Sequence, residues 1–244
     1  MKNWLRYTLV AVFTAGFAVG TGFLVHSTRK HDAMLCCNRM DVEFGDEYRF
    51  VGEEDIRQLV EAQCGNPIGL RLDSVNLARI EAGIKTRSAV RSCEAWTTKD
   101  GVLHLSVRQR KPVVRFVDGE DGYYSDAEAV LFPLPDGYEA EVHEVSGKAD
   151  GDLEWIRKVI SMLNYMDVRP EISSMVTSMR AAKDGELTLG SRDSTVAFIF
   201  GQPEDYAAKF ARMKEYYDYI DGQEQGYKTV NLKYKGQIIC RKGI

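Results

Sequence analysis

The side chains that most often carry out catalysis are few in this chain, and their spacing matches no known catalytic constellation. None of the four histidines has a metal-ligand or nucleophile motif beside it; they are His26, His31, His104 and His143. Ser27 and Lys30 have the Ser-x-x-Lys spacing of a nucleophile and its base. They directly follow a long apolar run, however, where no domain surrounds them to shape a site. We therefore expect no catalytic residue and no enzymatic activity.

The sequence also gives no sign of a cofactor, metal or nucleic-acid site. Asp118, Glu120 and Asp121 cluster beside glycines, a composition typical of a solvated turn rather than an acid–base pair. No P-loop, dinucleotide fingerprint or Gly-x-Ser-x-Gly motif is present in the sequence. A net charge of -4 provides no basic excess to hold phosphate backbones. We expect no cofactor, no metal and no nucleic-acid partner.

The five cysteines are odd in number and lack metal-site spacing; they are Cys36, Cys37, Cys64, Cys93 and Cys240. Adjacent residues such as Cys36 and Cys37 do not readily bridge each other. Two interpretations stay open for Cys64 and Cys93. They form a disulfide in an oxidising compartment, or they are small buried residues.

The element that organises the chain is an uncharged apolar run over residues 7–25. Roughly nineteen residues at about 1.5 Å rise reach about 28 Å as a helix, close to the hydrocarbon thickness of a bilayer. The run predicts a transmembrane helix over residues 7–27, with a cleaved signal peptide as the alternative. Gly16 and Gly20 form a small-xxx-small face on which another helix could pack. Glycine is common in membrane helices, which explains the pair equally well.

The layout around this run predicts the orientation of the protein. Residues 1–6 would form a short cytoplasmic tail, residues 28–37 a connector, and the remainder would lie on the outer face of the cytoplasmic membrane. Charge adds little to this inference, because Lys2 and Arg6 before the run are matched by Arg29 and Lys30 after it. About two hundred residues remain, enough for two small domains.

The first outward domain is expected over residues 38–111, in the order strand, helix, helix, strand, strand. Alternation over residues 39–44 predicts a strand, and residues 51–62 carry the apolar spacing of a helix. A second helix, capped by Asp73 or Ser74, follows and runs to about residue 84. Two further strands over residues 89–96 and 101–108 are joined by a turn at Lys99-Asp100-Gly101.

Three segments of this domain are similar to the POTRA domain of FtsQ/DivIB, a family of bacterial cell-division proteins: residues 77–81, 90–94 and 103–113. In that family a helix leads to a "Val-Arg" strand and then to a strand that closes on a basic-Pro-Val hinge. The resemblance places Lys111 and Pro112 at the hinge. POTRA domains also occur in transport systems, so this domain alone leaves another envelope assembly open.

The second outward domain is expected over residues 112–244, as a mixed β-sheet with two flanking helices. Strands are predicted over residues 113–117, 122–126, 130–133, 172–180, 187–189 and 195–200. Helices are predicted over residues 153–163 and from about Pro203 onward. On the second helix, an aromatic stripe has the spacing of a core face; it consists of Tyr206, Phe210, Met213 and Tyr217. The whole chain is thus α+β after its membrane helix.

This domain also resembles FtsQ/DivIB, in residues 123–126, residues 130–132 and above all the closing stretch 227–241. The family's usual turn glycine is replaced by Ala129, and this replacement predicts a different turn geometry. Asn231 and Lys233 stand where the family has aspartate and arginine. Lys209 matches a lysine that the family often carries.

The last strand is the candidate partner site. A terminal strand with little chain after it tends to lie at a sheet edge, where its unpaired backbone groups accept an incoming strand. Lys233, Lys235 and Arg241 would oppose self-pairing and attract an acidic partner. The resemblance implies that FtsB, of the FtsB–FtsL coiled-coil pair, adds its strand here. It matches Tyr234 and Gly236 to contact positions, and we extend the site to their neighbours Lys233, Lys235, Gln237 and Ile238.

These features predict a single-pass scaffold of the division machinery in the inner membrane at the septum. It would recruit septal cell-wall synthesis partners by strand addition, while the POTRA surface and the anchor recruit further division proteins. The alternative is a POTRA-containing component of another envelope transport or secretion assembly. A periplasmic hydrolase comes third, since it would need paired carboxylates or a Ser/Lys site in a pocket.

Overall fold

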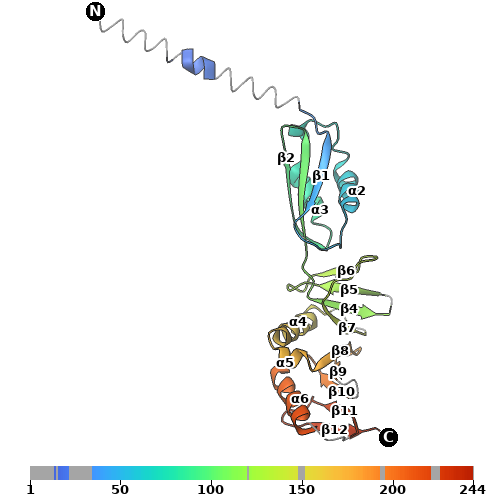
Figure 1. The fold of residues 1–244 in the computed structure, drawn as a ribbon. Coiled ribbons are helices and arrows are strands. Elements are labelled where there is room, and N and C mark those ends of the chain that lie inside the picture. The colour runs from blue at the N-terminus through green and yellow to red at the C-terminus, as the bar shows by residue number, and fades with distance from the viewer. Residues whose placement is uncertain are drawn as a thin grey trace, which may run out of the picture. The chain divides into compact units, whose positions relative to one another are not determined.

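The computed structural model describes residues 14, 16–21, 35–119, 121–147, 152–192, 196–220 and 226–243. The chain divides into two compact units. The first contains the residues up to Glu47 together with Val51–Gln109, and the second contains Tyr48–Phe50 together with Arg110–Ile244. Both combine helices with a β-sheet (Figure 1), which confirms the α+β class for the two units.

The transmembrane helix predicted over residues 7–27 lies outside the described residues, except for Thr14 and residues 16–21, which are helical. Among the described residues, no helix has the length and apolar character needed to cross a bilayer. Gly16 and Gly20 lie on the helical piece, and a Cβ added to either would meet no atom within 4 Å.

The first unit has the predicted β-α-α-β-β order, with one additional short helix. Its elements are β1 (Arg39–Phe44), α2 (Glu53–Cys64), the 3₁₀ helix η1 (Leu72–Ser74), α3 (Leu77–Ile84), β2 (Val90–Thr97) and β3 (Val102–Gln109). The sheet order is β1-β3-β2, with β1 parallel and β2 antiparallel to β3. Gly101 ends the β2–β3 turn at φ +86°, as its place in the predicted hairpin requires.

The two-residue period of the strands gives this sheet one buried face. Leu105 on β3 is paired with Val42 on β1 and with Ala95 on β2, so that side chains of all three strands share a face. Ile56 of α2 and Ile84 of α3 are fully buried, and both helices contact the sheet. The apolar face of the sheet and the apolar stripes of the helices therefore form one core.

The predicted cap of the second helix is wrong by a few residues. Asn76 caps α3, because its side-chain oxygen accepts a hydrogen bond from the Arg79 amide at 3.0 Å. Asp73 and Ser74 lie earlier, in η1. All three residue types make good N-caps, so the sequence offered several starting points and the short 3₁₀ turn decided between them.

The structure contains all five cysteines in described residues, and none forms a disulfide. Cys93 is buried on β2, whereas Cys36 is exposed. Burial, with a smaller contribution from the nearby Glu81 carboxylate, raises the pKa of the Cys93 thiol to about 11. Cys93 therefore fits the second interpretation as a buried thiol, whereas Cys64 is a partly buried free thiol.

We expect Cys93 to resist thiol reagents in the folded protein. A pKa of about 11 instead of 9.0 leaves about a hundredfold less thiolate at pH 8, and burial slows attack further. With a disulfide-exchange reagent at pH 8, Cys36 should react at least about 100 times faster than Cys93. Mass spectrometry of the labelled peptides gives the two rates. Equal rates in folded protein would contradict the burial of Cys93, and denaturant should equalise them.

The second unit contains nine strands and three helices among its described residues. They are β4 (Val114–Asp118), β5 (Asp121–Ser125), β6 (Leu131–Pro133), β7 (His143–Ser146), α4 (Leu153–Asp167), α5 (Pro170–Ser173), β8 (Val176–Ala181), β9 (Leu187–Ser191), β10 (Ala197–Gly201), α6 (Tyr206–Ile220), β11 (Tyr227–Asn231) and β12 (Ile239–Lys242).

All nine strands form one mixed sheet, in the order β12-β11-β10-β9-β8-β7-β4-β5-β6. β7 runs parallel to β4 and β8, and β10 runs parallel to β11, while the other pairs are antiparallel. The helices lie along one side of this sheet (Figure 1). A single apolar core joins α4 and α6 to the strands, with Phe198, Phe200 and Phe210 fully buried in it.

Two predicted elements of this unit begin later than expected. The strand predicted over residues 172–180 starts at Val176, because Pro170 opens the short helix α5 in front of it. Helix α6 starts at Tyr206 rather than near Pro203, since Asp205 has a φ of +50° and interrupts the helical backbone. The predicted core stripe on α6 is confirmed: Phe210 and Met213 are fully buried, and Tyr206 and Tyr217 pack against the same core.

The turn between β5 and β6 keeps a glycine-like backbone although it carries an alanine. Ala129 has a φ of +61°, and the Asp126 carboxylate accepts hydrogen bonds from the amides of Glu128 and Val130 at 2.9 Å each. A left-handed alanine costs about 1–2 kcal/mol. Burial of its methyl group in the core offsets up to about 0.8 kcal/mol of this cost. Ala129 therefore adopts the left-handed backbone that glycine adopts most easily.

Candidate partner-binding edge

The last strand lies at one end of the sheet. β12 pairs with β11, and within the part of the chain that the structure describes no strand covers its other side. The strand is short, from Ile239 to Lys242, and most of its residues are exposed. A strand in this position presents backbone donors and acceptors that an incoming strand could pair.

The six residues predicted to contact a partner lie in the connection that leads into β12, not on the strand itself. Lys233, Tyr234, Lys235, Gly236 and Gln237 are exposed, and Ile238 is partly buried against the core. Gly236 has a φ of +68°, and the Gln237 amide donates to the Tyr234 carbonyl at 3.4 Å. The connection is thus a tight turn that leaves the Tyr234 side chain 54% exposed.

The start of this turn is fixed by hydrogen bonds. The buried Leu232 donates its amide to the Ile199 carbonyl at 2.9 Å and accepts a bond from Arg212 of α6 at 2.8 Å. The Asn231 side chain accepts from the Lys233 amide at 2.9 Å, the bond of an Asx turn. The turn is therefore held in place before any partner arrives.

Lys233 helps to hold the turn in place, because its side chain is paired and does not extend freely into solvent. Its ammonium forms an ion pair with Glu186 at the start of the β9 hairpin, and that hydrogen bond raises the pKa of Lys233. Its side chain passes over Gly201 at the end of β10, where an added Cβ would lie 2.9 Å from the Lys233 Cγ. Lys233 is thus a predicted contact residue that also has a structural role.

We expect Gly201→Ala to destabilise the second unit and to loosen this turn. Gly201 has a φ of +74°, and a left-handed alanine costs about 1–2 kcal/mol before the clash with Lys233 is counted. Gly226→Ala is the matched control, because its φ is +63° but no atom lies within 4 Å of the added Cβ. Urea unfolding should show a larger loss for Gly201→Ala. Equal losses would mean that Lys233 moves aside at no cost.

A recess of about 540 Å³ lies beside the turn and carries both signs of charge. Lys209 of α6 is buried in its wall, where it donates to the Gln202 carbonyl at 2.7 Å, and desolvation lowers its pKa. Lys235 reaches Asp205 at 3.4 Å but remains largely exposed. Lys235 is therefore the most exposed lysine of this recess.

The predicted hinge residues lie between β3 and β4. Lys111 is exposed and Pro112 is buried, in a segment with no regular secondary structure. Both line a second recess together with His143 and Asp167, whose Nε2 and Oδ1 atoms are 2.6 Å apart.

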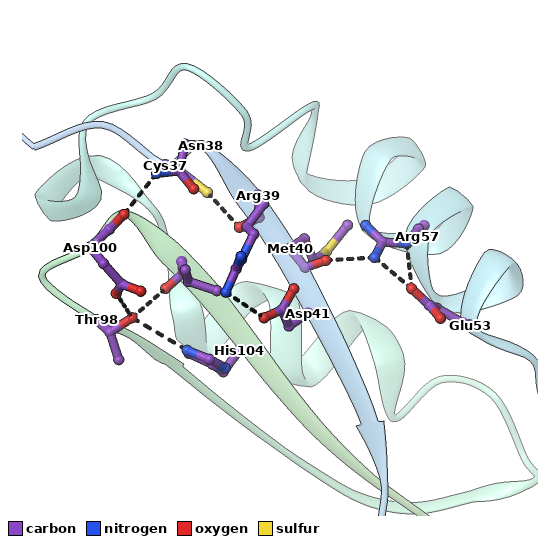
Figure 2. Close-up of polar contacts among 11 residues, drawn as sticks. Cys37, Asn38, Arg39, Met40, Asp41, Glu53, Arg57, Thr98, Asp100 and His104 are labelled. Atoms are coloured by element: carbon purple, nitrogen blue, oxygen red, sulfur yellow. Dashed lines mark hydrogen bonds and ion pairs between the residues drawn. The ribbon is translucent and has the colours of Figure 1, made fainter.

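The histidines in described residues contact neighbouring side chains of the fold. His104 lies 3.3 Å from the Thr98 hydroxyl, and Thr98 in turn bonds Asp100 in the β2–β3 turn (Figure 2). The His104 ring also stacks on Trp96 across the sheet. Within the described ranges, no group of three or more His, Cys, Asp or Glu side chains is arranged to hold a metal ion.

Ile239 is a candidate contact residue that the sequence interpretation missed. It is the first residue of β12 and is 46% exposed, while its neighbour Ile238 packs against the core. The sequence carried this signal, since consecutive residues of an extended chain point to opposite sides and one of two adjacent isoleucines is then exposed. Tyr234 and Ile239 together give the edge two exposed apolar side chains.

A POTRA-like β-α-α-β-β unit followed by a mixed sheet with an open terminal edge defines a modular α+β protein of the POTRA-containing class. Comparison with protein families agrees, since residues 35–108 match a POTRA-like domain. Residues 111–241, more than half of the chain, match the family described as FtsQ/DivIB, C-terminal related. The chain belongs to the FtsQ/DivIB-related family, as the sequence resemblance indicated. Domains of this family are typically non-catalytic scaffolds. A search of curated proteins found no match.

Proposed function

We propose that this protein is a non-catalytic, membrane-anchored scaffold of the bacterial division machinery. It binds a partner by strand addition to β12. The proposal rests on the open edge of β12. A fixed turn precedes this strand, and the side chains of Tyr234 in the turn and of Ile239 on the strand are exposed. The membership of the chain in the FtsQ/DivIB-related family supports the division role.

The charge of the edge favours an acidic partner segment. Lys235, Arg241 and Lys242 are exposed around β12, whereas Lys233 is already paired with Glu186. Lysine on an edge opposes pairing between two copies of the same strand and attracts an acidic strand instead. The partner is a membrane-anchored coiled-coil pair of the FtsB/FtsL kind, which meets the scaffold on the outer face of the inner membrane at the septum.

The other parts of the scaffold follow from the same proposal. Residues 7–27 anchor the chain, with the short tail 1–6 in the cytoplasm, and Gly16 and Gly20 allow a partner helix to approach. Lys111 and Pro112 form the hinge between the POTRA domain and the second domain. The POTRA surface and the anchor recruit further division proteins.

Site-specific photo-crosslinking in living cells tests the partner. The probe is placed in turn at Tyr234, Lys235, Gln237 and Ile239, with a control probe at Val168, which is 72% exposed on the same unit. The proposal predicts an adduct to a small single-span coiled-coil protein from the first four positions and none from Val168. Adducts to outer-envelope or transport proteins alone would overturn the assigned partner.

The POTRA-like match keeps a second function in view, since such domains serve other envelope assemblies. In that case the protein would be a component of a transport or secretion system. Depletion of the protein separates the two functions: filamentous or chained cells indicate division, and normal division with impaired export indicates transport.

A further inference from the structure

We propose that the loop between α2 and η1 rests on the membrane surface through the side chains of Ile68 and Leu70. The inference extends the proposed function and rests on its membrane anchor. The contact would add a second attachment between the first unit and the bilayer, besides the anchor itself.

Ile68 and Leu70 stand out because they are apolar and exposed. Each is 44% exposed, and among described residues 35–109 the other large apolar side chain in this state is Trp96, which stacks on His104. The loop fixes them outward. The Ile68 amide donates to the Asn66 side chain at 2.9 Å, the Leu70 amide donates to the Pro67 carbonyl at 3.1 Å, and Gly69 between them has a φ of +87°.

The loop is attached to the segment through which the chain enters the first unit. The Cys37 amide donates to the Leu70 carbonyl at 2.8 Å, and the Gly69 amide donates to the Cys37 carbonyl at 2.7 Å. The Leu72 amide donates to the Leu35 carbonyl at 2.9 Å. The two exposed side chains therefore lie beside the end of the unit that is joined to the proposed anchor.

The length of the connector keeps this loop close to the bilayer. Residues 28–34 separate the proposed anchor from Leu35. Seven residues span at most about 25 Å even when fully extended. The polar region of a bilayer is itself about 5–8 Å thick on each side. The covalent length of the connector therefore keeps the loop within reach of the headgroup region.

The composition of the loop suits lipid better than an acidic or basic protein surface. Residues 65–70 carry no charged side chain, and Arg71 is neutralised by Asp73 at 2.5 Å. Apolar side chains without nearby charge favour shallow insertion at the level of the headgroups. Arg29 and Lys30 in the connector add attraction to anionic lipids.

Fluorescence quenching by brominated lipid tests the contact in the full-length protein. Ile68→Trp and the matched control Val168→Trp are reconstituted in vesicles of phosphatidylcholine and phosphatidylglycerol, with and without bromine on the acyl chains. The wild-type protein supplies the background of its own three tryptophans. We expect brominated lipid to reduce at least twofold the tryptophan fluorescence that Ile68→Trp adds to the wild-type signal. The fluorescence that Val168→Trp adds should be unchanged. Equal quenching at both positions would overturn the proposal.

Two further measurements separate the loop from the anchor. Wild-type protein that alkaline carbonate removes from membranes would refute the anchor, and with it the basis of this inference. Anchored protein without quenching at position 68 refutes the loop contact alone. A photo-crosslinker at position 68 that labels a protein instead of lipid would also overturn the proposal, and labelling of lipid would support it.

Discussion

The double variant Tyr234→Glu with Ile239→Glu should bind the proposed coiled-coil partner at least about 100-fold more weakly than the wild type, with the fold intact. Central apolar anchors of an interface each contribute about 2 kcal/mol or more, and each 1.4 kcal/mol is about tenfold in affinity. Both side chains are exposed, so that their replacement leaves no cavity in the core. The effect should therefore appear in binding and not in stability.

Binding of the full-length protein to the partner trapped by crosslinking gives the affinity of each variant. The matched control is Tyr219→Glu, which places the same charge change on an exposed tyrosine of α6 in the same unit. The control should bind like the wild type. Equal weakening by the control would indicate a general charge effect, and an unchanged double variant would refute β12 and its turn as the site.

Asp126→Ala should reduce the free energy of unfolding of the second unit by about 3–5 kcal/mol. The Asp126 side chain is almost completely buried and lies 2.6 Å from the guanidinium of Arg110, which is itself mostly buried. It also accepts the two amide bonds of the β5–β6 turn. The substitution therefore removes the closest carboxylate from the buried Arg110 guanidinium. It also leaves two backbone amides without their hydrogen-bond acceptor.

Urea unfolding followed by tryptophan fluorescence measures this loss. Trp155 is buried in the core of the second unit and donates to the Gly185 carbonyl at 2.8 Å, so it reports on that unit. The other two tryptophans, Trp4 and Trp96, are replaced by phenylalanine in every variant. Glu128→Ala is the control, since Glu128 lies 3.6 Å from Arg110 but is largely exposed, and it should cost under about 1 kcal/mol. A similar loss in both variants would contradict the role of the buried pair.

The local elements of the fold were largely predictable, because they depend on short-range patterns. The alternation over residues 39–44 gave β1, and the spacing of Phe210 and Met213 gave the buried face of α6. Helix starts were less certain, as Asn76 shows, since neighbouring polar residues compete for the cap. Asp205 could not be foreseen as the residue that delays α6, because nothing in its type requires a positive φ.

The order of the nine strands could not be derived from the sequence alone. The parallel pairs β4–β7 and β10–β11 join segments separated by other elements, and such pairing depends on the packing of the whole unit. The six residues predicted to contact a partner lie directly before β12, and their role stays a prediction. The distinction between the turn that holds Tyr234 and the strand that begins at Ile239 required the structure, because it depends on the hydrogen bonds of Asn231 and Leu232.

The length of β12 limits how tightly strand addition alone can hold a partner. Its four residues offer about four backbone bonds on the open side, at about 1 kcal/mol each. A total of about 4 kcal/mol corresponds to a dissociation constant near 1 mM. The side-chain contacts of Tyr234 and Ile239 must therefore supply the rest of the affinity. Keeping two sites within reach of each other raises their effective concentration, so that confinement to one membrane would favour this contact where both proteins accumulate and would release the proposed partner when either disperses.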